Sequence, residues 1–133
     1  MAKDIRWKQR FENLERAFSF LEKAVSQKEY DELQQAGLVQ CFEFSFELAW
    51  KTMKDFLETM GISASYPREI IKESFKSGLL EDGHIWIQML DKRNELSHTY
   101  NDDQAKKAVR LIREDYFPAI KQVYHKLKNE CDR

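Results

Sequence analysis

Residues 7–25, WKQRFENLERAFSFLEKAV, carry the pattern that decides the fold. Their large apolar side chains recur at alternating steps of four and three residues, at Trp7, Phe11, Leu14, Phe18, Leu21 and Val25. This spacing places them on one stripe of an α-helix, with charged residues on the other faces. We therefore predict a helix over about residues 4–27 that buries one side against neighbouring helices.

A second and longer helix is predicted over about residues 31–60, ending at Gly61, which suits the left-handed position after a helix end. Three apolar side chains, those of Phe44, Leu48 and Phe56, lie off its main stripe, which holds Leu38, Phe42, Phe46, Trp50, Met53, Leu57 and Met60. A helix that is apolar beyond one stripe usually contacts two surfaces. We expect this helix both to fill the core and to meet another subunit.

The middle of the chain predicts a short helix over about residues 67–77. Pro67 favours the first helical position and Gly78 the position just after a helix end. The next helix begins near residues 82–83, and its apolar side holds Ile85, Met89, Leu90 and Leu96.

The final helix is predicted to begin at Asn101, with Gln104 placed as in a capping box, and to reach about residue 129. Pro118 lacks an amide donor and disfavours the helical state of the residue before it, so we expect a kink or break near residues 116–117. Four long helices and one short helix in the middle connection predict an all-α fold. We expect an antiparallel four-helix up-and-down bundle, built by residues 1–133 as one domain.

Composition supports this fold class. The 133 residues are 42% hydrophobic and 13% aromatic, enough for one core, and they include only 4 Gly and 2 Pro against 34% charged residues, unlike a turn-rich β protein. The net charge of -1 argues against a general basic surface that coats nucleic acid.

The compartment is predicted from two further features. The first residues lack an apolar run, and no stretch is apolar enough for a signal peptide or a membrane span. Cys41 and Cys131 have no metal-type spacing, which favours reduced thiols. We expect a cytoplasmic protein.

The segment RNELSHTY, residues 93–100, is the main chemical motif. Arg93 can hold a phosphodiester through two parallel hydrogen bonds, and His98 can move a proton near neutral pH. Tyr100 offers a hydroxyl that can be modified or can bind. This is a working set for phosphate chemistry.

The spacing R-x4-H-x-Y resembles the signature of HEPN ribonuclease toxins whose partner is a minimal nucleotidyltransferase antitoxin, and Asn94 fits that family's preference for a polar residue there. The resemblance extends over nearly the whole chain and narrows to the nucleotidyltransferase substrate-binding-like branch of HEPN proteins. The residues that carry it are Phe46, Glu47, Leu48, Ala49, Trp50, Lys51, Gly61, Pro67, Arg68, Glu69, Gly78, Leu79, Leu80 and Trp86. Such proteins are small bacterial helical bundles.

The resemblance implies one of two functions. In the first, a toxin–antitoxin system, Arg93 and His98 cleave RNA without metal, and a partner nucleotidyltransferase silences the toxin by attaching AMP to Tyr100. In the second, the chain is a non-catalytic subunit that binds substrate for that nucleotidyltransferase. Both imply a homodimer that associates with a separate small nucleotidyltransferase chain. The sequence has no Gly-Ser plus Asp-x-Asp pattern, so the chain is not itself expected to transfer nucleotides.

Arg93 and His98 do not converge on an unbroken helix, where they would be about 140° and about 7.5 Å apart. A two-fold interface that joins two copies of the motif is the option we favour; the long reach of Arg93 or a helix that loosens at residues 97–99 stay open. Neither Asp91 nor Glu95 has helical ion-pair spacing to Arg93. Any ion-pair partner of Arg93 must come from another part of the fold, so we expect Arg93 to be available to bind phosphate. His98 could instead cap carbonyls at the helix end.

Supporting or RNA-binding roles are predicted for Asn94, Ser97, Lys92, Lys106, Lys107 and Arg110. Residues 92–113 carry six cations and three carboxylates, whereas the whole chain has nearly equal numbers of cationic and acidic residues. The alternative is that these cations form ordinary solvated helix faces.

No metal or other cofactor is expected. His84 and His125 have no zinc-type spacing, and Glu43 and Glu47, one helical turn apart, lack the Glu-x-x-His companions of a di-metal bundle. Trp50 and Trp86 are expected to anchor the core or an interface rather than stack on nucleobases.

Overall fold

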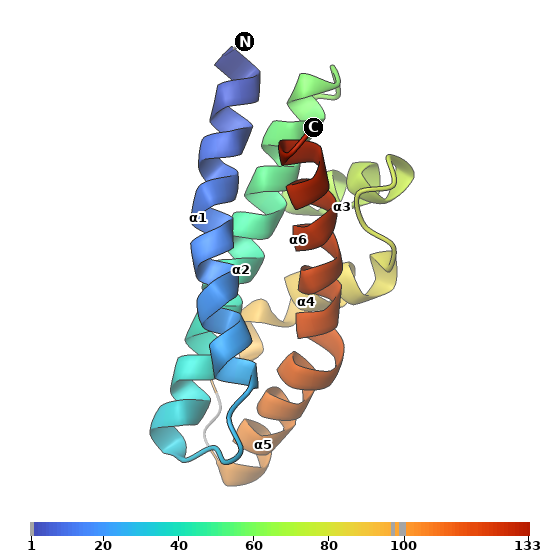
Figure 1. Ribbon diagram of the computed structural model, residues 1–133. Coiled ribbons are helices and arrows are strands. Elements are labelled where there is room, and N and C mark those ends of the chain that lie inside the picture. The colour runs from blue at the N-terminus through green and yellow to red at the C-terminus, as the bar shows by residue number, and fades with distance from the viewer. Residues whose placement is uncertain (1, 97, 99–100) are drawn as a thin grey trace.

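The computed structural model describes residues 2–96, 98 and 101–133, and within these residues the ordered elements are all helical (Figure 1). They are α1 Ala2–Val25, α2 Glu32–Thr59, α3 Pro67–Lys76, α4 Gly83–Leu96, α5 Asp102–Leu111, the π-helical segment η1 Ile112–Tyr116 and α6 Phe117–Cys131. The last three follow one another without a gap and make one long helix. The predicted all-α bundle, with a short helix in its middle connection, is confirmed.

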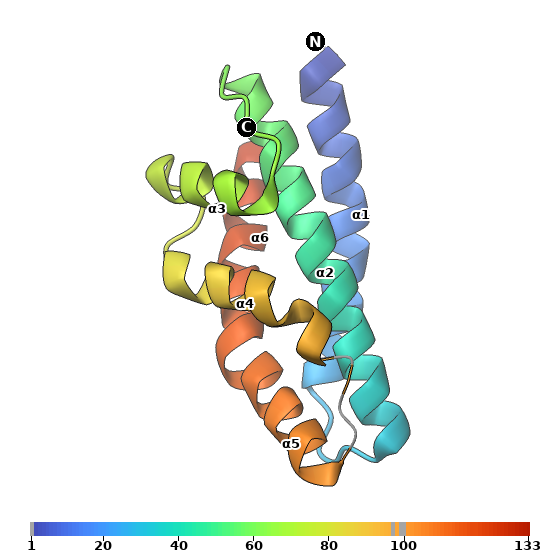
Figure 2. The ribbon, with the colours of Figure 1, turned by 180° about the vertical axis from the view of Figure 1, so that it is seen from behind.

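Helices α1 and α2 and the continuous helix from α5 to α6 run up and down along the length of the molecule, whereas α4 crosses them obliquely (Figure 2). Helices α1 and α2 lie side by side and antiparallel, and the start of α1 and the end of α6 lie at the same end of the molecule (Figures 1 and 2). Helix α3 packs on α2 and α4, and α4 packs on α2 and η1. The opposite end of the bundle holds the starts of α2 and α5, and α4 ends beside α2, between this end and the middle of the molecule (Figure 2).

One buried charge fixes α1 against α2. Asp55 is only 4% exposed, and its carboxylate oxygen lies 2.6 Å from Nε of Arg10 on α1. A buried carboxylate needs such a partner because it has lost its hydration. This pair joins the two antiparallel helices, whose shared apolar side faces the rest of the bundle.

The helix ends follow the local chemistry of the sequence. Asp31 caps α2 by a capping box: its carboxylate accepts from the Gln34 amide at 2.8 Å and its own amide donates to the Gln34 side chain at 2.9 Å. At the other end Gly61 has φ +78°, and Ile62 N–H donates to Leu57 C=O at 3.0 Å. This is a Schellman ending, which requires a left-handed residue. The predicted end at Gly61 is confirmed.

Of the two alternatives expected before Pro118, a kink or a break, the structure has a kink, formed by a wider helical turn. Pro118 cannot donate to the carbonyl four residues before it, and its ring would clash there. The chain adopts the π-helical segment η1 in front of the proline, where Phe117 N–H donates to Ile112 C=O, five residues back. The helix continues, with α5 inclined to α6 (Figure 2).

The core is rich in aromatic contacts. Phe18 on α1 stacks on Tyr124 of α6 with ring centroids 4.3 Å apart, and Phe42 on α2 stacks on Tyr116 of η1 at 5.3 Å. Burying a side chain of this size is worth about 1.5–3 kcal/mol. The main stripe of α2 fills this core, whereas Phe44 is 57% exposed. Contact of α2 with another subunit stays a prediction.

Candidate functional site

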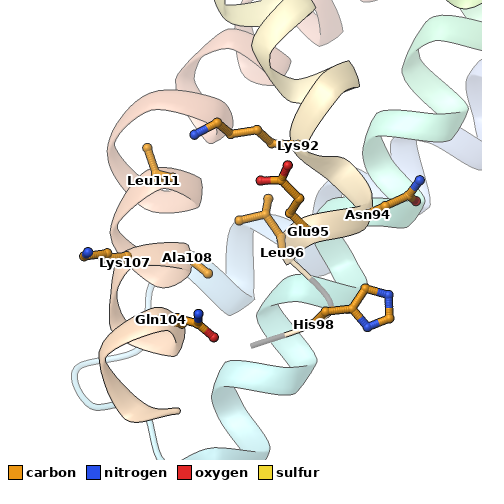
Figure 3. Close-up of a pocket in the computed structure, with 9 residues that line it drawn as sticks. All are labelled: Lys92, Asn94, Glu95, Leu96, His98, Gln104, Lys107, Ala108 and Leu111. Atoms are coloured by element: carbon orange, nitrogen blue, oxygen red, sulfur yellow. The ribbon is translucent and has the colours of Figure 1, made fainter. Parts of the chain in front are cut away.

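A cavity of about 550 Å³ lies between the end of α4 and α5 (Figure 3). Its walls carry two cations, Lys92 and Lys107, and one carboxylate, Glu95. The full lining consists of Lys92, Asn94, Glu95, Leu96, His98, Gln104, Lys107, Ala108 and Leu111. Asn101 positions the α5 wall, because its side chain accepts from the Gln104 amide at 2.8 Å and starts the helix.

His98 lies just beyond α4 rather than in its last turn. Helix α4 ends at Leu96, and the His98 amide donates to Glu95 C=O at 3.1 Å, a tight turn that closes the helix. The side chain is exposed. Its ring points to the same side as the Asn94 amide, away from Lys107 on α5 (Figure 3). His98 thus borders the cavity and faces outward.

Arg93 turns from α4 toward α2. Its Nη1 donates to Oε1 of Glu47 at 2.6 Å, and its guanidinium carbon lies 5.9 Å from the centre of the Phe46 ring. The other oxygen of Glu47 accepts from the indole Nε1 of Trp50 at 3.0 Å. Glu47 is therefore held by Trp50 and holds Arg93, which fixes a long side chain in one orientation.

The expected partner of Arg93 from another element is confirmed, since Glu47 comes from α2. The expectation that Arg93 is left available is wrong in part, because one of its nitrogens is committed to that carboxylate. Its side chain still is 28% exposed and that of Glu47 37%. A planar guanidinium has five donors, so the edge away from Glu47 can receive an anion.

Residues 9–129, almost the whole chain, match a protein family described as "Nucleotidyltransferase substrate binding protein like". The chain belongs to this nucleotidyltransferase substrate-binding family. The resemblance noted from the sequence is confirmed by this match.

Relatives of known sequence or structure agree with the family. A protein of Haemophilus influenzae named probable ribonuclease HepT is 39% identical over 75 residues, which are 53% of this chain and 51% of the relative, so the match spans about half of that protein's length. The crystal structure of a Thermus thermophilus protein aligns with a TM-score of 0.78 and 28% identity, over 86% of this chain and 98% of that one. A Haemophilus influenzae structure, described as the fold of a substrate binding domain of a nucleotidyltransferase, aligns with a TM-score of 0.76 and 29% identity, over 89% and 98%.

The predicted cations of this family member divide between two sides of α5. Lys92 and Lys107 line the cavity beside His98. Lys106 and Arg110 line a different hollow with Arg113, and Lys106 forms an ion pair with Asp102 at 3.1 Å. Ser97 and Tyr100 lie outside the described residues.

Glu47 is the site residue that the sequence pattern did not assign. Its spacing to Glu43 suggests only half of a metal pair, yet it lies within residues 46–51, one of the segments that carry the family resemblance. Through its contacts with Trp50 and Arg93, this segment holds the guanidinium of Arg93 in place.

Three further observations concern metal ligands, the two tryptophans and membrane-spanning helices. Among the described residues, no group of three or more His, Cys, Asp or Glu is arranged to hold a metal ion. Trp86 is fully buried and stacks on Phe46 at 5.8 Å, as expected of a core anchor, whereas Trp50 is half-buried. In the described part of the chain, no helix has the length and apolar character needed to span a lipid bilayer.

Proposed function

We propose that this chain is a HEPN-type toxin subunit, a metal-independent endoribonuclease that acts through Arg93 and His98. The observation that carries the proposal is the fixed guanidinium of Arg93, five residues before an exposed His98 at the edge of a cavity with two lysines. The Haemophilus influenzae relative, named probable ribonuclease HepT, supports the same activity.

The chemistry needs no protein nucleophile. The ribose 2′-hydroxyl attacks the adjacent phosphorus while His98 accepts its proton, and the bond from phosphorus to the 5′-oxygen breaks. The leaving oxygen takes a proton, so the products are a 2′,3′-cyclic phosphate and a 5′-hydroxyl. Arg93 neutralises charge that develops on the phosphorane oxygens, through the edge that Glu47 does not occupy.

A homodimer would assemble the pair. In one chain Arg93 faces α2 and His98 lies past the end of α4, facing outward. A two-fold axis beside this end of the bundle would bring each motif to its copy and supply a second imidazole as the proton donor. Phe44, exposed on α2 three residues before Glu47, is an apolar side chain suited to such an interface.

The partner in this proposal is a separate small nucleotidyltransferase, as the family description suggests. It transfers AMP from ATP to the Tyr100 hydroxyl: the new bond joins the tyrosine oxygen to the α-phosphorus, and pyrophosphate leaves. The attached phosphate then competes with the RNA phosphate for Arg93.

The alternative is a non-catalytic subunit that binds substrate for the nucleotidyltransferase. It is favoured by the family description and by the structural relative described as a substrate binding domain. Under this alternative the motif binds a phosphate without cleaving it.

Product analysis separates the two functions. RNA incubated with the purified chain in a chelator should give 2′,3′-cyclic phosphate ends, and a 2′-deoxy sugar at the cleaved position should abolish cleavage there. If RNA stays intact, or 2′-deoxy substrates are cut equally well, the 2′-hydroxyl mechanism is wrong.

Intact-mass analysis tests the modification. After incubation with the partner enzyme and ATP, the chain should gain AMP, and Tyr100→Phe should gain none. An equal gain in Tyr100→Phe would exclude this residue as the acceptor.

A further inference from the structure

A second basic cavity lies on the other side of α5, where this helix meets the end of α1. It has a volume of about 450 Å³, and three of its lining residues are cations against one carboxylate. The lining consists of Val25, Lys106, Val109, Arg110, Arg113, Glu114 and Phe117. None of these residues lines the cavity beside His98.

Arg113 is held in place at this cavity. Its Nε donates to Val25 C=O, near the end of α1, at 3.1 Å, and its guanidinium carbon lies 5.2 Å from the centre of the Tyr30 ring. The Tyr30 hydroxyl in turn donates to Ala24 C=O at 2.6 Å. A cation fixed by its neighbours loses little conformational entropy when it binds an anion.

The other two cations are less engaged. Lys106 shares an ion pair with Asp102, but both side chains are about 70% exposed, 69% and 72%, and such surface pairs are weak. Arg110 is exposed and, within the part of the chain that the structure describes, has no ion pair. Arg110 and Arg113 therefore offer two guanidinium groups to the same cavity, and guanidinium groups are well suited to bind phosphodiesters.

We propose that Arg110 and Arg113 bind a backbone phosphate of RNA, at a second subsite for the strand whose scissile phosphate lies at Arg93 and His98. This inference rests on the proposed ribonuclease function. Helix α5 supplies Lys107 to the first cavity and Arg110 to the second, so the strand crosses the exposed side of one helix.

The width of that helix sets a length requirement. An α-helix with side chains is about 10–12 Å across, whereas one nucleotide adds about 3.4 Å along the axis of a stacked strand. The two subsites therefore bind phosphates that are not neighbours in the strand. A dinucleotide occupies only one of them, whereas an octanucleotide spans both.

The test measures binding without cleavage, using 2′-O-methyl RNA, which lacks the attacking hydroxyl. Arg110→Gln should weaken binding of a labelled octanucleotide several-fold and lower the salt dependence of binding by about 0.7 in slope, the value for one phosphate contact on a single strand. Dinucleotide binding at His98, followed by nuclear magnetic resonance shifts, should not change. Arg16→Gln, the same substitution at an exposed position of α1, is the matched control and should bind like the parent.

The outcomes separate the subsite from the ribonuclease proposal. Two results would overturn the subsite in a parent that binds the octanucleotide: Arg110→Gln binds as tightly as the parent, or Arg16→Gln is impaired as much as Arg110→Gln. An Arg110→Gln variant that binds RNA normally but loses binding to an acidic protein would also overturn it. Binding that depends on Arg110, in a protein that leaves unmodified RNA intact, would support the subsite and refute cleavage. A parent that binds no RNA refutes both.

Discussion

The carboxylate of Glu47 binds two side chains, those of Trp50 and Arg93. Its carboxylate accepts from Trp50 at 3.0 Å and from Arg93 at 2.6 Å, and it is 37% exposed. Ion pairs this exposed contribute at most about 1 kcal/mol to stability. Its main effect is geometric, because it restricts a cation whose orientation matters for phosphate chemistry.

Glu47→Ala should therefore change turnover more than stability. We expect kcat for RNA cleavage to fall about 10- to 100-fold, since a misplacement of about 1 Å can cost about 10²-fold. KM should not rise, because a carboxylate has been removed beside the phosphate. Steady-state kinetics and a melting curve measure both effects, with the exposed Glu12→Ala on α1 as control. A higher KM at unchanged kcat would contradict a positioning role.

Tyr124 links α1 to α6 through a hydrogen bond that depends on pH. Its hydroxyl donates to Glu15 at 2.7 Å, and burial together with this carboxylate raises the pKa of Tyr124 to about 12. The unfolded tyrosine ionises near pH 10, so between about pH 10 and 12 the unfolded state binds fewer protons and stability falls as pH rises. In chemical denaturation, the free energy of unfolding should drop between these pH values less in Tyr124→Phe than in the parent. Equal slopes would contradict this.

At the scale of elements, η1 shows how core packing and a proline act together. Pro118 explains why the helix cannot continue with regular hydrogen bonds, and the wide turn carries Tyr116 into full burial against Phe42. The proline is exposed, whereas Tyr116 is not. The buried ring should therefore contribute more to the stability of the turn than the proline does.

Substitutions at these two positions separate their contributions. Tyr116→Ala should lower the free energy of unfolding by about 3–5 kcal/mol, the range for large aromatic deletions from a core. Pro118→Ala should change it by about 1 kcal/mol or less, because the added amide donor offsets the greater freedom of the unfolded chain. Urea unfolding measures both. A larger loss in Pro118→Ala would show that the proline holds the turn.

Across the molecule as a whole, the features of the fold that have a local cause could be predicted from the sequence. The stripe of α1 follows from helical periodicity, and the ends at Gly61 and Gly78 follow from a backbone with positive φ at each glycine. The contact of Arg93 with Glu47 joins residues 46 positions apart, so it depends on how α4 meets α2. The exit of His98 from α4 and the π-helical turn likewise depend on tertiary packing, which periodicity does not contain.

The proposed dimer is a property of this whole surface. We expect the purified chain to sediment as a dimer at micromolar concentration, and Phe44→Ser to shift it toward monomer and lower RNA cleavage. Phe75→Ser, on α3 and similarly exposed at 52% against 57%, is the control and should stay dimeric. A monomeric parent would contradict the two-fold arrangement of the motif.

RNA cleavage by the chain purified without its partner, in the presence of a chelator, tests the central claim most directly. The parent should cleave, and His98→Ala should cleave about 10²- to 10⁴-fold more slowly, the usual effect of removing a general acid or base. His84→Ala, an equally simple change at an exposed histidine of α4, should cleave like the parent. Cleavage that His98→Ala retains, or a parent that cuts no RNA, would contradict the ribonuclease and favour the substrate-binding subunit.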